Sequence, residues 1–152
     1  MYEFTVPAGL PDWIQDHVRE YLATNGASGH LWDSSERGWK GIVPTLLLVT
    51  KGRKTGKTQT LPLIYGNADH GYVVVGSKGG APDHPAWYLN LMADPNVSIQ
   101  VGDRRMDAKA RTAQGAERAA LWKKMVAAFP PYETYEKRTQ REIPLVVLEP
   151  GQ

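Results

Sequence analysis

The chain has 152 residues, 41% of them apolar, which is enough to bury one hydrophobic core, so we expect a single domain over residues 1–152. The 18 basic and 16 acidic side chains nearly balance, which argues against a nucleic-acid-binding protein. Cysteine is absent, so disulfides, thiolate metal sites and cysteine nucleophiles are excluded, and with no visible leader segment we expect a cytoplasmic protein.

The first predicted element is a helix at about 11–24. Apolar residues recur there at helical spacing, Pro11 suits a first turn, and Asn25 with Gly26 suits a helix end. Packing against the core is the simplest role for the apolar stripe. Its polar face is acidic rather than basic, so weak association with the inner face of a membrane is the lesser alternative.

Residues 25–44 form a Gly- and Ser-rich connection that carries Trp32 and Trp39 and is longer than most connections. It is either a lid over a site or a loop anchored by two tryptophans.

Six short apolar or alternating segments then predict strands. They cover about 45–50, 60–65, 72–76, 97–101, 106–111 and 143–148. Pro62 predicts an edge position or a bulge, and Gly102-Asp103 predicts a tight hairpin. The links are too short for most crossover helices, so we expect a mainly antiparallel sheet that closes into a small barrel. Further helices are predicted at about 84–93 and 114–128, with a short turn at about 132–138 after Pro130-Pro131.

Two glycine-rich loops carry cations. From Gly38 to Lys78, six basic residues face one acidic residue, a net charge of +5. The segment 52–57 (GRKTGK) lacks the Walker spacing, and 76–80 (GSKGG) leads from a strand towards a helix. Backbone N–H groups and cations in such loops suit a phosphorylated ligand, although ordinary turns are the alternative.

A metal site is not expected, because the four histidines have no metal-ligand spacing, and no hydrolytic motif is present. The aromatic residues Phe129, Tyr132 and Tyr135 recur three apart and share one face. They form either hydrophobic packing over the barrel mouth or a substrate wall with a phenol as proton donor.

Three segments, in order, carry a family resemblance: PTLLLVTKGRKTGKTQTLPLIYG, VVVGSKGGAPDHPAWYLNLMADP and REIPLVVLEP. With these motifs the chain resembles the deazaflavin-dependent nitroreductases and the related quinone reductases of actinobacteria. The resemblance implies a split β-barrel of the flavin-reductase-like kind. It also implies coenzyme F-420, an 8-hydroxy-5-deazaflavin with a phosphodiester-linked oligoglutamate tail, used in its reduced form.

By the same resemblance, the cofactor-binding residues are Arg53, Lys54, Lys57, Gln59, Pro62, Gly76, Ser77, Lys78, Trp87 and Asn90. The catalytic residues are Tyr132 as proton donor, with Tyr135 and Ser77 assisting. Two positions depart from the family: some relatives have Tyr in place of Phe129, and many have a basic residue in place of Gln59. These departures remove one proton donor and one phosphate contact.

We therefore expect a reductase that transfers a hydride from the reduced deazaflavin to a small quinone-like or nitroaromatic acceptor, and we expect a monomer. A reductase that uses FMN on a similar barrel is the rival enzyme. A non-catalytic carrier of deazaflavin or of an apolar ligand is the rival from another class.

Overall fold

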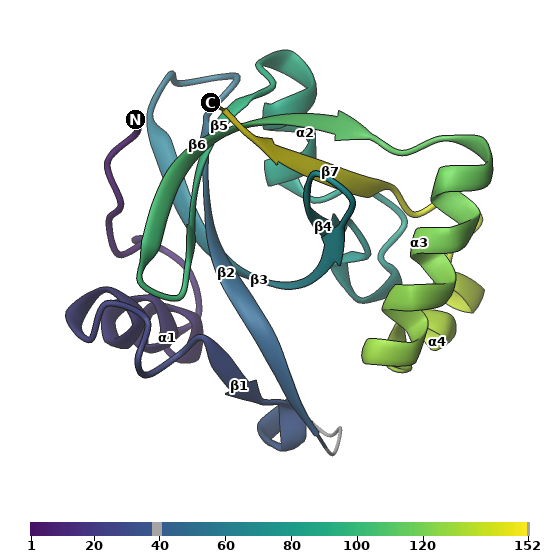
Figure 1. The fold of residues 1–152 in the computed structure, drawn as a ribbon, viewed down its shortest axis with the longest axis horizontal. Coiled ribbons are helices and arrows are strands. Elements are labelled where there is room, and N and C mark those ends of the chain that lie inside the picture. The colour runs from purple at the N-terminus through teal and green to yellow at the C-terminus, as the bar shows by residue number, and fades with distance from the viewer. Residues whose placement is uncertain (38–40, 152) are drawn as a thin grey trace.

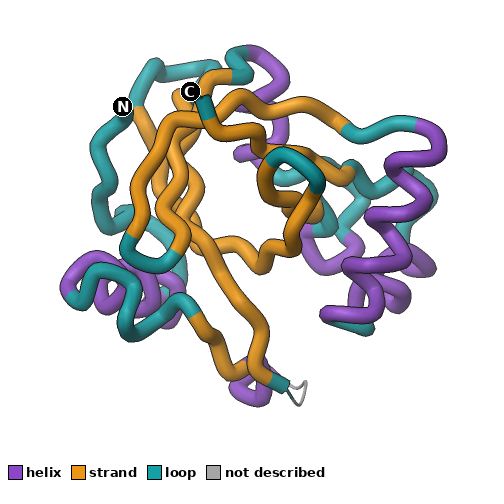
Figure 2. Tube along the Cα trace, viewed as in Figure 1, coloured by secondary structure: helices purple, strands orange, loops and turns teal. Residues whose placement is uncertain are grey.

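The computed structural model describes residues 1–37 and 41–151, and Trp39 and Lys40 lie outside the described residues. Its strands form one antiparallel sheet in the order β1-β2-β3-β4-β7-β6-β5. Because β5 also pairs with β2, the sheet closes into a barrel, seen end-on in Figures 1 and 2. The predicted antiparallel barrel is confirmed.

The strands are β1 (Leu31–Asp33), β2 (Ile42–Lys51), β3 (Thr58–Ala68), β4 (Gly71–Val75), β5 (Asn96–Val101), β6 (Arg104–Thr112) and β7 (Leu145–Pro150). The helices are α1 (Asp12–Ala23), α2 (Ala86–Ala93), α3 (Gly115–Ala128) and α4 (Pro131–Arg138), with 3₁₀ turns η1 (Ser34–Arg37) and η2 (Lys78–Gly80). Every predicted element is present, with bounds that differ by a few residues. The sequence analysis did not predict β1, which has three residues and pairs with the start of β2.

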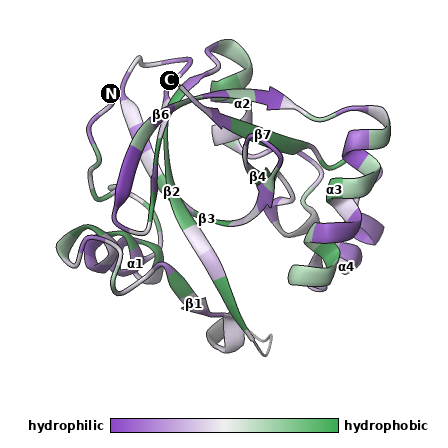
Figure 3. Ribbon diagram, viewed as in Figure 1, coloured by the Kyte–Doolittle hydropathy of each residue, from purple (hydrophilic) through white to green (hydrophobic). Residues whose placement is uncertain are grey.

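Strand β7 is apolar on both faces, as its green colour in Figure 3 shows. Val146 and Leu148 belong to the core inside the barrel. Leu145 and Val147, which alternate with them, pack outside the barrel with Met125 of α3. Because successive side chains of a strand point to opposite faces, the apolar residues of β7 contribute to two cores. One core lies inside the barrel and the other lies under α3 and α4.

Helix α1 lies on the other side of the barrel from α3 and α4 (Figure 1). Its Val18 and Tyr21 are buried against Leu47 of β2. The Tyr21 hydroxyl lies 3.0 Å from the Thr45 carbonyl oxygen and accepts a hydrogen bond from the Gly102 N–H at 2.8 Å. The apolar stripe thus packs on the barrel, as expected. Within the described ranges 1–37 and 41–151, no helix has the length and apolar character needed to cross a membrane.

Pro62 lies where β3 changes partner. Residues Thr58 to Ile64 pair with β2, whereas pairing with β4 starts only at Tyr65. At Pro62, β3 therefore pairs with β2 alone. A proline, which has no N–H to donate to a second ladder, is tolerated at such a position. The expectation of an edge position is confirmed locally, and this split edge opens the barrel beside the candidate site.

Candidate functional site: a cleft at the split edge of the barrel

A cleft of about 1110 Å³ lies at the split edge of β3. The α1 and β1 residues form one part of its wall, and α4 with the preceding Phe129 and Pro130 forms another. The volume slightly exceeds the usual range of about 300–1,000 Å³ for small-molecule and cofactor sites, so the cleft has room for a ring system and a second small molecule.

Most of the site residues predicted from the sequence converge on this cleft. The residues that line it are Gln59, Pro62, Ser77, Lys78, Trp87, Tyr132 and Tyr135, together with Phe129. The predicted residues outside its lining are Arg53, Lys54, Lys57, Gly76 and Asn90.

The aromatic face comes from the break between α3 and α4. Pro130 and Pro131 end the first helix, and Pro131 suits the first turn of the second. The Tyr132 ring packs edge-on against Phe129, with centroids 5.0 Å apart, and against Tyr135 at 6.2 Å. Burial, with a smaller contribution from Tyr135, raises the pKa of the Tyr132 phenol above its usual value. A phenol is protonated at neutral pH even at its usual pKa, and the raised pKa extends that range to higher pH.

The loop 76–81 forms a further part of the wall of the cleft, through Ser77, Lys78 and Gly79. Ser77 is buried, and Lys78, Gly79 and Gly80 are all left-handed, with φ of +47°, +63° and +84°. A Cβ atom on Gly80 would lie 2.8 Å from the Tyr135 carbonyl oxygen, so glycine lets the loop pack directly on α4. The loop and the aromatic face are one continuous wall.

The basic loop 52–57 is attached to the cleft through α2. The Asn90 side-chain oxygen accepts hydrogen bonds from the Arg53 backbone N–H at 3.2 Å and from the Arg53 guanidinium at 3.1 Å. Trp87, on the same helix, lines the cleft. Asn90 is buried, whereas Arg53, Lys54 and Lys57 are exposed. The loop therefore presents cations to solvent beside the cleft rather than within it.

The sequence analysis missed a third group of lining residues. Trp13, His17 and Trp32 form an aromatic stack at the α1 and β1 end of the cleft, with centroid separations of 6.1 Å and 6.3 Å. The His17 Nε2 atom lies 2.8 Å from the Gly29 carbonyl oxygen, which fixes the ring. The sequence signal was present in Trp13 and Trp32, but it did not show that α1 reaches the split edge. Arg138, whose guanidinium lies 5.7 Å from the Tyr135 ring centre, was missed too.

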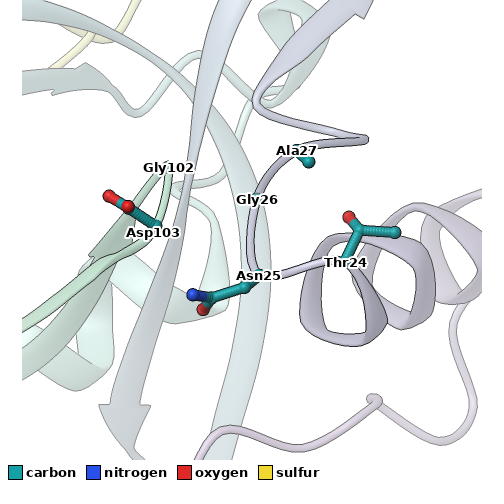
Figure 4. Close-up of a pocket in the computed structure, with 6 residues that line it drawn as sticks. All are labelled: Thr24, Asn25, Gly26, Ala27, Gly102 and Asp103. Carbon is teal, nitrogen blue, oxygen red and sulfur yellow. The ribbon is translucent and has the colours of Figure 1, made fainter.

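A second pocket, of about 400 Å³, lies between the end of α1 and the β5–β6 hairpin (Figure 4). Of its six lining residues, only Asp103 is ionisable, and its carboxylate points away from the helix. Gly26 packs so closely on Gly102 that a Cβ atom there would lie 2.2 Å from the Gly102 carbonyl oxygen. This pocket is the seam that joins α1 to the barrel, and its residues carry no evident chemistry.

The closed antiparallel barrel has the flavin-reductase-like fold. The family model of the F420H(2)-dependent quinone reductases matches residues 13–150, and this chain belongs to that family.

Relatives and solved structures agree with the family. The F420H(2)-dependent quinone reductase Rv1261c of Mycobacterium tuberculosis is 37% identical over 148 residues, which cover 90% of this chain and 95% of the relative. A solved F420-H2 dependent reductase (FDR-A) is 44% identical, with a TM-score of 0.65, covering 70% of this chain and 94% of its own. Another structure, described as a domain-swapped dimer, is 37% identical with a TM-score of 0.67 and covers 91% and 98% of the two chains. The expected family, fold and cofactor class are confirmed.

The residues of the cleft fit a deazaflavin with an acidic tail. Pro62, Ser77 and Trp87 offer a partly apolar slot at an edge of the sheet. The cations of the basic loop lie beside α2, where Asn90, about one turn from Trp87, holds the loop. A planar ring with a phosphorylated tail needs this combination of an apolar slot and nearby cations.

Proposed function

We propose that this protein transfers a hydride from reduced coenzyme F-420 to a quinone-like acceptor bound in the same cleft. The observation that carries the proposal is the convergence of Ser77, Trp87 and Tyr132 on one cleft that the basic loop adjoins. The reduced deazaflavin would supply the hydride, that is, one proton and two electrons. A quinone then needs one proton to become the hydroquinone, and the protein must deliver it.

Tyr132 is the proposed proton donor. Its phenol is held by Phe129 and Tyr135 and stays protonated at neutral pH, and burial raises its pKa. A phenol at an acceptor oxygen neutralises the negative charge that develops there. Ser77 and Tyr135 assist by fixing ring and acceptor. The proposed reaction needs no acid–base pair with unusual pKa values among these residues, because the hydride chemistry belongs to the cofactor.

The proposed cofactor-binding residues divide into two groups. Pro62, Ser77, Lys78, Trp87 and Gln59 hold the ring and its first substituents in the cleft. Arg53, Lys54 and Lys57 attract the phosphate and the acidic tail, with Asn90 holding Arg53 in place. Gly76 serves the turn itself, since a Cβ there would lie 2.8 Å from a Pro144 ring carbon.

The proposal is tested by titrating the protein with coenzyme F-420 and following its fluorescence. Stopped-flow oxidation of the reduced form is then measured with a panel of quinones and one nitroaromatic. We expect saturable binding and fast oxidation by a quinone. Binding without oxidation by any acceptor indicates the carrier, and reconstitution with FMN but not with coenzyme F-420 indicates the FMN-dependent reductase.

For assembly and location we propose a monomer that acts in the cytoplasm. Light scattering after gel filtration tests this, and a stable dimer, as in the domain-swapped relative, contradicts it.

We propose only a minor contribution of α1 to membrane association, because Val18 and Tyr21 are buried on the barrel. Co-sedimentation with vesicles tests that point.

A further inference from the structure

Arg141, in the segment between α4 and β7, makes hydrogen bonds through all three guanidinium nitrogens. Its Nε donates to the Ala81 carbonyl at 3.0 Å, and its Nη2 donates to the Ser77 carbonyl at 2.8 Å. Its Nη1 donates to the Gly76 carbonyl at 3.1 Å and lies 3.0 Å from Nδ1 of His84. One side chain therefore joins both ends of the loop 76–81 to the start of the α2 segment.

The guanidinium is a planar, rigid fork, so four bonds to it fix the spacing of the groups that accept them. A lysine ammonium is a single point on a flexible stem and does not span the same carbonyls. The His84 bond agrees with this geometry, because burial and the neighbouring Arg141 both lower the pKa of His84, which keeps Nδ1 free to accept.

The loop held in this way has an unfavourable conformation. Lys78 is a left-handed residue with a side chain, at φ of +47°, and it is followed by two left-handed glycines. Such a backbone persists only when the surroundings hold it. Gly80 is held by close packing on Tyr135, and the ends of the loop are held by Arg141.

Ser77 and Lys78 line the cleft, whereas Arg141 is outside its lining. We infer that Arg141 is a positioning residue: it holds the loop 76–81 in the one conformation that presents Ser77 and Lys78 to the cofactor. This inference rests on the proposed function. It predicts that the loop is already ordered in the cofactor-free protein. The entropy cost of ordering the loop then does not reduce the binding free energy of the cofactor.

The test compares Arg141→Lys with the matched control Arg118→Lys. Arg118 is also half-buried and donates to a main-chain carbonyl next to β7, that of Ile143 at 2.7 Å, but it contacts neither the loop nor the cleft. Each variant is titrated with coenzyme F-420 well below its melting temperature. Hydrogen exchange of the amides of residues 77–81 is measured without cofactor. The KM for the reduced coenzyme and kcat are measured with a quinone as the acceptor.

We expect Arg141→Lys to weaken coenzyme binding and raise its KM about tenfold, to leave kcat within about twofold, and to speed exchange in the loop. Arg118→Lys should match the parent in all four quantities. If Arg141→Lys does not fold, Arg141→Gln, which keeps one donor, replaces it.

Equal affinity and equal loop exchange in the parent and in Arg141→Lys overturn the inference, as does an equal loss in both arginine variants. A parent protein that does not bind coenzyme F-420 at all overturns the proposed function instead.

Discussion

The two glycine-rich cationic loops look alike in the sequence and differ in the structure. The loop 76–81 is partly buried, has three left-handed residues in a row, and is bonded at both ends by Arg141. The loop 52–57 is exposed, and its contact with the rest of the protein includes one buried side chain, Asn90. The first loop lines the cleft and the second does not.

The difference teaches that the two loops act over different ranges. A buried loop in a fixed conformation contributes through contact geometry, which salt hardly changes. Exposed cations contribute through an electrostatic field, which is screened beyond about 8–10 Å at physiological salt. We therefore propose that the same residue types position a ring in one place and attract a charged tail in the other.

The largest effect is expected from Tyr132→Phe, on the wall against which the buried loop packs. The ring stays and only the hydroxyl is lost, so turnover with a quinone should fall about 100-fold while coenzyme affinity is unchanged. Single-turnover oxidation of the reduced cofactor measures the rate. Tyr135→Phe, the matched control one turn away, should fall much less.

If Tyr132→Phe reacts at the parental rate, water is the donor and the phenol only packs. If it loses the cofactor instead, Tyr132 belongs to the cofactor pocket. The pH profile gives a second check: because the pKa of Tyr132 is raised, the donor stays protonated and the rate should not fall between pH 7 and about 10.

Charge reversal in the exposed loop should give the next largest effect. Lys54→Glu is expected to weaken coenzyme binding about tenfold, because it places an anion near the phosphate and the acidic tail. The loss should shrink as salt is raised from 0.05 M to 0.5 M, since the interaction is screened. Ser77→Ala is the comparison: its loss of affinity should be the same at both salt concentrations. Identical salt dependence for the two variants contradicts the distinction between the loops.

A smaller effect is expected at the α1 and β1 end of the cleft, to which neither loop contributes a residue of the aromatic stack. Trp13→Ala removes one ring of the stack with His17 and Trp32, so KM for a quinone should rise about threefold to tenfold. The Kd of coenzyme F-420 should not change. A change confined to the cofactor Kd would place the coenzyme, not the acceptor, against α1.

The smallest effect, none, is expected from chelators and thiol reagents. The chain has no cysteine, and its four histidines lack metal-ligand spacing. Turnover with and without EDTA measures this, and loss of activity with the chelator alone would show a metal-dependent step.

The sequence predicted the barrel because its strands are short, alternating and closely linked, with signals such as Gly102-Asp103 at the turns. It predicted Pro62 at an edge because proline cannot donate to a ladder. It did not predict β1 or the contribution of α1 to the cleft, since both depend on how distant segments pack. Arg141 gave no sequence signal: its role comes from four acceptors in residues 76–84, about sixty positions away in the chain. The choice between a lid and an anchored loop for residues 25–44 stays open, and part of that segment lies outside the described residues.

The most direct test of the account is a crystal structure of the protein with coenzyme F-420 bound. The account predicts the deazaflavin ring in the cleft beside Pro62, Ser77 and Trp87, with the phosphate and tail running towards Arg53, Lys54 and Lys57. It also predicts a loop 76–81 unchanged from the cofactor-free protein. A ring bound elsewhere, or a tail directed away from the basic loop, would contradict the account in which the loop 76–81 positions the ring and the loop 52–57 attracts the tail.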